Sequence, residues 1–163
     1  MRKNFDARQE KYVKKLSDTY EIPVEVIQVS PKVNAKELNQ AILLAQTTGA
    51  KVIALNPPNY FDIKVYSFLT NNLRTYQEQY PDLQFTIISP DTSAMKYIPI
   101  PKYRFGNLAD IIKKYKCHIG LDISVTDQDV IDDFLILKMP ILVEHINICY
   151  IADRLKDKKY LIP

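Results

Sequence analysis

Glycine, cysteine and long apolar runs are scarce in this chain, and each scarcity excludes a class of function. Glycine occurs three times in 163 residues. Neither G-x-G-x-x-G nor G-x-x-x-x-G-K-[ST] occurs, so a dinucleotide or P-loop site is not indicated. The two cysteines, Cys117 and Cys149, form no Cys-x-x-Cys pair, which argues against a zinc knuckle or a redox motif. We expect both to be reduced, buried residues beside strands.

Positively and negatively charged residues are nearly balanced in number. The chain has 22 Lys+Arg and 19 Asp+Glu, a net charge of +3, so neither nucleic acid nor an anionic membrane is favoured as a partner. No apolar run approaches the roughly 20 residues of a membrane helix, and the N-terminus lacks an apolar signal core. We therefore expect a cytoplasmic protein whose 163 residues form one domain.

What the sequence does contain is an alternation of short apolar runs with helical patterns. The five runs are residues 24–28, 51–56, 84–89, 118–122 and 141–145. Five helices are predicted. They cover residues 5–18, the segment from Asn34 to Gly49, a segment that starts at Asp62, the segment from Asn107 to Lys116, and a segment that starts at Thr126 or Asp127. This alternation predicts an α/β fold with a parallel sheet, either an open doubly wound sheet or a (β/α) barrel. A loop over 90–106 and a polar tail from Asp153 without a strand complete the prediction.

Each apolar run ends on a polar residue: Gln28, Asn56, Ser89, Asp122 and His145. Parallel sheets place their sites at the carboxyl ends of the strands, so we expect these five side chains at one edge. Asp122 and His145 are suited to bind a divalent cation or a substrate hydroxyl. The alternative is structural: an aspartate that caps the next loop and a histidine that satisfies a core hydrogen bond.

Side-chain alternation favours the barrel over the open sheet. In residues 118–124, His118, Gly120 and Asp122 share one face, while the isoleucines and the leucine between them share the other. In the last predicted strand, 141–147, His145 and Asn147 share a face. A helix-covered face opposite a small or polar face is what a barrel strand needs. His118, at the start of its strand, is expected to be structural.

From about Gln84 to Ile148 the sequence resembles the xylose-isomerase-like TIM barrels, which include sugar phosphate isomerases, epimerases and apurinic-site endonucleases. The resemblance lies in residues 85–89, 106–112, 119–122 and 143–146, which follow the order and spacing of that superfamily. It implies a parallel (β/α) barrel of the TIM type that is incomplete. Residues 1–163 would then supply about five strand–helix units, corresponding to strands three to seven.

The resemblance also implies a site. Asp122 and His145 match metal ligands at the ends of strands six and seven, whereas Ser89 stands where a glutamate is typical. The implied function is a metal-assisted isomerase or epimerase of a sugar or sugar phosphate, with several ligand positions missing. The candidate substrate-binding residues are Gln28, Asn56, Ser89, Asp91 and Asn147. The alternatives are a non-catalytic protein that binds a small molecule or a partner, and an abasic-site endonuclease relative, for which two histidines are few.

An incomplete barrel should leave its edges and inner face open. The inner face is expected to carry Val24, Val26, Val52, Ala54, Phe85, Ile87 and Val143. Exposed apolar surface of this kind marks an interface or an aggregation risk. We therefore expect the chain to self-associate through its open edges or to be marginally stable, and to show no robust isomerase turnover on its own.

Overall fold

The computed structural model describes residues 7–90, 94–95, 98–104, 108–122, 144–150, 152–155 and 158–161. The helices are α1 (Ala7–Tyr20), α2 (Ala35–Thr48), α3 (Ile63–Gln79) and α4 (Leu108–Tyr115). The strands are β1 (Val26–Gln28), β2 (Val52–Leu55), β3 (Gln84–Ile88), β4 (Ala94–Met95), β5 (Ile98–Pro101), β6 (His118–Asp122), β7 (Ile146–Tyr150), β8 (Ala152–Leu155) and β9 (Lys158–Leu161). The helix predicted from Thr126 or Asp127 and the residue Asp91 lie outside the described residues.

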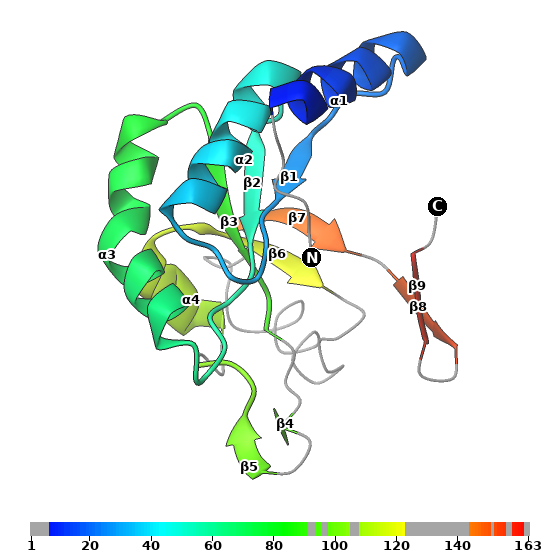
Figure 1. Cartoon of the computed structure of the whole chain (residues 1–163). Helices are drawn as coiled ribbons and strands as arrows, with labels where there is room; N and C mark the ends of the chain where they lie inside the picture. The colour runs from blue at the N-terminus through cyan, green and yellow to red at the C-terminus, as the bar shows by residue number, and fades with distance from the viewer. Residues whose placement is uncertain are drawn as a thin grey trace.

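Five strands form one parallel sheet in the order β1-β2-β3-β6-β7, which is also their order along the chain. Right-handed crossovers between strands added in a single direction leave all the connecting helices on one face of the sheet. Figure 1 shows α2, α3 and α4 on that face, with α1 beside α2. The result is a curled half-barrel, and the prediction of an α/β fold with sequential parallel strands is confirmed.

Local signals set the ends of the helices as the sequence predicts. The side-chain oxygen of Asn34 accepts hydrogen bonds from the backbone N–H groups of Lys36 and Glu37 at 2.9 and 3.2 Å. Gly49, at φ 85°, ends α2 in the left-handed conformation that glycine adopts without strain. Asp62 caps α3 by accepting from the N–H of Val65. These caps fix where the chain leaves one strand and returns to the next.

The hydrophobic core lies between the helices and one face of the sheet. Its strand residues are Ile27, Ile53, Leu55, Phe85, Ile87, Ile119 and Leu121, packed with helix residues such as Leu38, Leu69 and Ile111. Each such side chain contributes roughly 1.5–3 kcal/mol when fully buried. The expectation that Phe85 and Ile87 line the inner face is wrong, because their register partners, Ile53 and Leu55, also belong to the core.

The last strand of the sheet lies further along the chain than predicted. Glu144 and His145 form a turn, β7 begins at Ile146, and residues 141–143 lie outside the described residues. Ile119 pairs with Ile146, Asp122 pairs with Tyr150, and the N–H of Ile119 donates to the carbonyl of His145 at 2.7 Å. Apolar residues occur both before and after His145, so the hydrophobic pattern allows either placement, and pairing with β6 selects the later one.

Two small antiparallel sheets lie outside the half-barrel. Strands β4 and β5 pair within the predicted loop, and β8 and β9 pair in the tail where no strand was predicted. A two-stranded ribbon is held by backbone hydrogen bonds, so it needs no apolar run to signal it. Of the helices in the described ranges, none is both long enough and apolar enough to cross a membrane.

The two cysteines differ in environment. Cys117 is buried as expected, whereas Cys149 is exposed. Cys149 lies on β7, the last strand of the sheet, and its register partner is Leu121 on β6. Strand β7 has a neighbour on one side within the described part of the chain, which explains why a residue on this strand remains exposed.

Candidate functional site

The concave face of the half-barrel is the face of the sheet opposite the helices. By register it carries Val26, Gln28, Val52, Ala54, Gln84, Thr86, Ile88, His118, Gly120, Asp122 and Tyr150. None of the four described helices covers this face (Figure 1). We call the end where the parallel strands finish the carboxyl edge, and the end where they begin the amino edge.

Asp122 and Tyr150 lie side by side at the carboxyl edge. They are register partners at the ends of β6 and β7, and Asp122 is 8% exposed. The hydroxyl of Tyr150 is buried and has no hydrogen-bond partner within the described residues. Burial, and secondarily the nearby Asp122 carboxylate, raise the pKa of Tyr150. The pair therefore combines a carboxylate with a neutral phenol that can donate a hydrogen bond.

Gly120 explains how the Tyr150 ring reaches across β6. A Cβ at position 120 would lie 3.3 Å from Cε2 of Tyr150 and 3.3 Å from Cγ2 of Thr86. Contacts that short are tighter than van der Waals packing accepts without displacement. Glycine thus lets side chains from β3 and β7 approach each other over the strand between them.

Two of the predicted site residues tie strand ends together. The N–H of Ser89 donates to the carbonyl of Gly120 at 2.7 Å, and its Oγ accepts from the N–H of Asp122 at 2.8 Å. Asn56 donates through Nδ2 to the carbonyl of Val29 at 3.1 Å. Gln28 lies exposed at the end of β1. The structure therefore places Gln28, Asn56, Ser89 and Asp122 at the carboxyl edge.

A loop anchor flanks this edge. The N–H of Tyr60 donates to the carbonyl of Lys102 at 2.9 Å, and Asn59 forms an isolated antiparallel bridge with Tyr103. The guanidinium of Arg104 lies 4.6 Å from the ring centre of Tyr66 and 5.6 Å from that of Tyr60. Such cation–π contacts hold the segment after β5 against the loop after β2 and the first turn of α3.

His145 does not lie at the carboxyl edge, so the prediction that it converges with Asp122 is wrong. It precedes β7, and its ring centre lies 6.2 Å from that of His118 at the amino edge, with the rings inclined by 61°. Four residue steps along β6 separate His118 from Asp122, about 13 Å in an extended strand. Burial, and secondarily His145, lower the pKa of His118.

Asn147 also lies in the amino half of the sheet. Its Oδ1 accepts from the hydroxyl of Thr86 and its Nδ2 donates to Oε1 of Gln84, both at 2.9 Å. These bonds join β7 to β3 over β6. Sequence reasoning missed Gln84 and Thr86, although their alternation along one strand places them on one face.

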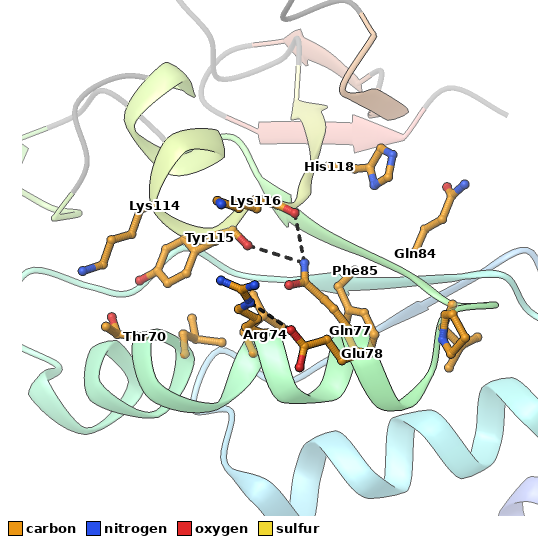
Figure 2. Close-up of a pocket in the computed structure, with 14 residues that line it drawn as sticks. Thr70, Arg74, Gln77, Glu78, Gln84, Phe85, Lys114, Tyr115, Lys116 and His118 are labelled. Carbon is orange, nitrogen blue, oxygen red and sulfur yellow. Dashed lines mark hydrogen bonds and ion pairs between the residues drawn. The ribbon is translucent and has the colours of Figure 1, made fainter.

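A groove of about 630 Å³ opens between α3, α4 and the starts of β3 and β6 (Figure 2). On the α3 side of the groove, the exposed side chains of Arg74 and Glu78 pair at 2.9 Å. Gln77 donates to the carbonyls of Tyr115 and Lys116 at 3.5 and 3.2 Å, which ties α3 to the end of α4. Gln77 therefore holds α3 and α4 together, whereas the Arg74–Glu78 pair lies within α3. The groove is lined from the amino side, away from Asp122.

Metal-ligating side chains do not gather at either edge in groups of three. Within the described ranges, no three or more histidine, cysteine, aspartate or glutamate side chains are placed to hold one ion. Among Gln28, Asn56, Ser89 and Asp122 at the carboxyl edge, Asp122 is the one that carries a carboxylate, so the predicted divalent metal stays a prediction.

The chain matches no protein-family model, no curated protein and no solved structure. The Asp122–Tyr150 pair on the concave face therefore defines the candidate site by geometry alone.

Proposed function

We propose that this chain is part of a parallel barrel of the TIM type and binds a sugar or sugar phosphate at the carboxyl edge. In this proposal the Asp122 carboxylate accepts hydrogen bonds from ligand hydroxyls, and the Tyr150 hydroxyl binds a ligand oxygen. The observation that carries the proposal is the pairing of Asp122 with Tyr150, whose buried hydroxyl has no partner among the described residues.

Physical chemistry supports a ligand rich in hydroxyl groups. A buried polar group without a hydrogen bond costs about 1–3 kcal/mol, so a ligand oxygen that reaches Tyr150 recovers that cost. A carboxylate has two oxygens that accept hydrogen bonds, so it can bind two adjacent ligand hydroxyls at once. The carboxyl ends of parallel strands are also where barrel enzymes and binding proteins place their ligands.

Binding without turnover is favoured over catalysis for this chain. Moving a proton between adjacent carbons requires an acid–base pair close to the substrate. Among the described residues that end the five strands of the half-barrel, Asp122 alone carries a carboxylate. A metal-assisted isomerase is the second candidate, and it rests on Asp122 lying beside Tyr150, since these two groups could exchange a proton through a bound ligand.

Titration of the chain with pentoses, hexoses and their phosphate esters tests the proposal. Asp122→Asn should weaken binding about tenfold or more, because hydrogen bonds to a charged group contribute about 1.5–3 kcal/mol. Tyr150→Phe should weaken it about 2- to 10-fold, as expected for a neutral hydrogen bond. The matched controls are Asp82→Asn and Tyr12→Phe, which remove the same groups from exposed positions away from this edge.

The outcomes separate the two candidates. Binding that both site variants weaken, with no exchange of substrate hydrogen for deuterium in the presence of Mg²⁺ or Mn²⁺, supports a binding function. Exchange that depends on Asp122 favours the isomerase. Equal binding by the wild type and both site variants, or no binding of any sugar in the panel, contradicts the proposal.

We also propose that the chain self-associates through its open edges. Within the described residues β1 and β7 each pair with one neighbour, which leaves backbone donors and acceptors unpaired on their outer sides. Sedimentation at micromolar concentration should detect dimers or larger species. A cooperatively unfolding monomer over the same concentration range would contradict this expectation.

A further inference from the structure

The two histidines of the chain lie close together at the amino edge, although they are far apart in the sequence. The chain contains two histidines in all. His118 is the first residue of β6 and His145 is the last residue of the turn before β7. Because β6 and β7 are parallel neighbours, their starts lie together, and the two rings lie edge to face with their centres 6.2 Å apart.

This separation suits one ion held between two imidazoles. With metal–nitrogen bonds of about 2.0–2.1 Å, two imidazoles on a common ion have ring centres about 4.5 Å apart at a right angle at the metal, about 5 Å apart at a tetrahedral angle and about 6.4 Å apart when they lie opposite each other. The observed 6.2 Å lies within this range near its upper end, so the rings must move about 1 Å closer to bind at a tetrahedral angle. Both side chains are partly exposed, so rotation about χ2 can turn a nitrogen of each ring toward a shared point. Imidazole nitrogen is a preferred ligand of Zn²⁺, Ni²⁺ and Cu²⁺.

The surroundings hold the two histidines in place. The N–H of Ile119 donates to the backbone carbonyl of His145, so the position of the turn is fixed by β6 and not by the imidazole. Asn147 ties β7 to β3 through Thr86 and Gln84. Gln84 and His118 line the same groove (Figure 2), which leaves room for water on the open coordination positions. Because the backbone at both positions is held, ion binding restricts only the rotation of the two side chains.

We propose that His118 and His145 chelate one divalent late transition-metal ion at the amino edge, a site separate from Asp122. Two imidazoles supply two of the ligands, and water completes the coordination. This site does not depend on the sugar-binding proposal, since the two lie at opposite ends of β6.

Calorimetric titration of the tag-free full chain with Ni²⁺ near pH 7.5 tests the site. The Cys149→Ser variant serves as the background, because an exposed thiol also binds metals. We expect one ion per chain, and both His118→Gln and His145→Gln should weaken the apparent affinity at least about tenfold, since the second ligand acts at high effective concentration. His145→Gln leaves the backbone bond to Ile119 in place, so this variant should fold normally.

Three results would overturn the proposal. The first is two ions per chain of equal weak affinity, with each variant losing one ion and keeping the affinity of the other. The second is binding that is unchanged in the folded His145→Gln variant. The third is no detectable binding to the Cys149→Ser chain. Thermal unfolding gives an independent readout, since Ni²⁺ should raise the melting temperature of Cys149→Ser and leave that of the same chain with His145→Gln nearly unchanged.

Discussion

The two edges of the half-barrel carry different chemistry. At the carboxyl edge, Ser89 ties β3 to β6 and the carboxylate of Asp122 lies beside the phenol of Tyr150. At the amino edge, the two imidazoles lie edge to face, and the amide of Asn147 binds Thr86 in the same half of the sheet. About 13 Å of extended strand separates these groups. The placement of β7 along β6 therefore decides which residues form one site, because a shift of β7 by about four residues would move His145 from the amino edge to the carboxyl edge.

Removing a core side chain between the edges should affect both of them. Ile119 is 1% exposed in the middle of this region. We expect Ile119→Ala to lower the free energy of unfolding by about 2–5 kcal/mol and to weaken sugar and Ni²⁺ binding together. Urea unfolding with both titrations measures this. Ile22→Ala, at an exposed position, is the control, and loss of one site alone in Ile119→Ala would contradict a shared β6 framework.

Ser89→Ala should disturb the carboxyl edge and leave the amino edge unchanged. It removes the acceptor of the Asp122 N–H, a buried donor, at a cost of about 1–3 kcal/mol. Sugar binding should weaken, because the position of Asp122 depends on this bond, while Ni²⁺ binding should not change. Urea unfolding and both titrations check these expectations.

Thr86→Val should disturb the amino edge alone, with a smaller loss of stability than Ser89→Ala causes. The substitution keeps the shape of the side chain but removes the donor to Oδ1 of Asn147, so we expect a loss of about 1 kcal/mol. The affinity for Ni²⁺ should fall, and the affinity for the sugar should remain unchanged. If Ser89→Ala and Thr86→Val lower both affinities equally, the two edges are not independent.

The thiols provide a probe that leaves the fold unchanged. Burial raises the pKa of Cys117 from 9.0 to about 12, whereas Cys149 is exposed. Iodoacetamide at pH 8 should therefore modify Cys149 and spare Cys117 until the chain is unfolded, as mass spectrometry would detect. Since the unfolded thiol titrates near 9 and the folded one near 12, Cys117 contributes stability below pH 9 that is lost as the pH rises toward 12. Equal modification of the two native thiols would contradict this packing.

Sequence reasoning predicted the first four strands of the half-barrel because each is a single apolar run with a clear end. It also predicted the caps Asn34 and Asp62 and the stop at Gly49, whose effects are local. It failed at β7, where apolar residues flank His145 on both sides and long-range pairing with β6 chooses the register. Tyr150 was missed for the same reason, since the end of a strand cannot be named until its register is known.

A through-space NMR measurement between ring protons tests the placement of β7 most directly. The chain has two histidines, so their ring signals can be assigned from single substitutions. We predict a cross-peak between the rings of His118 and His145, together with backbone contacts between Ile119 and Ile146. Cross-peaks from the His145 ring to Asp122 or Ser89, with none to His118, would contradict the division of the chemistry between two edges.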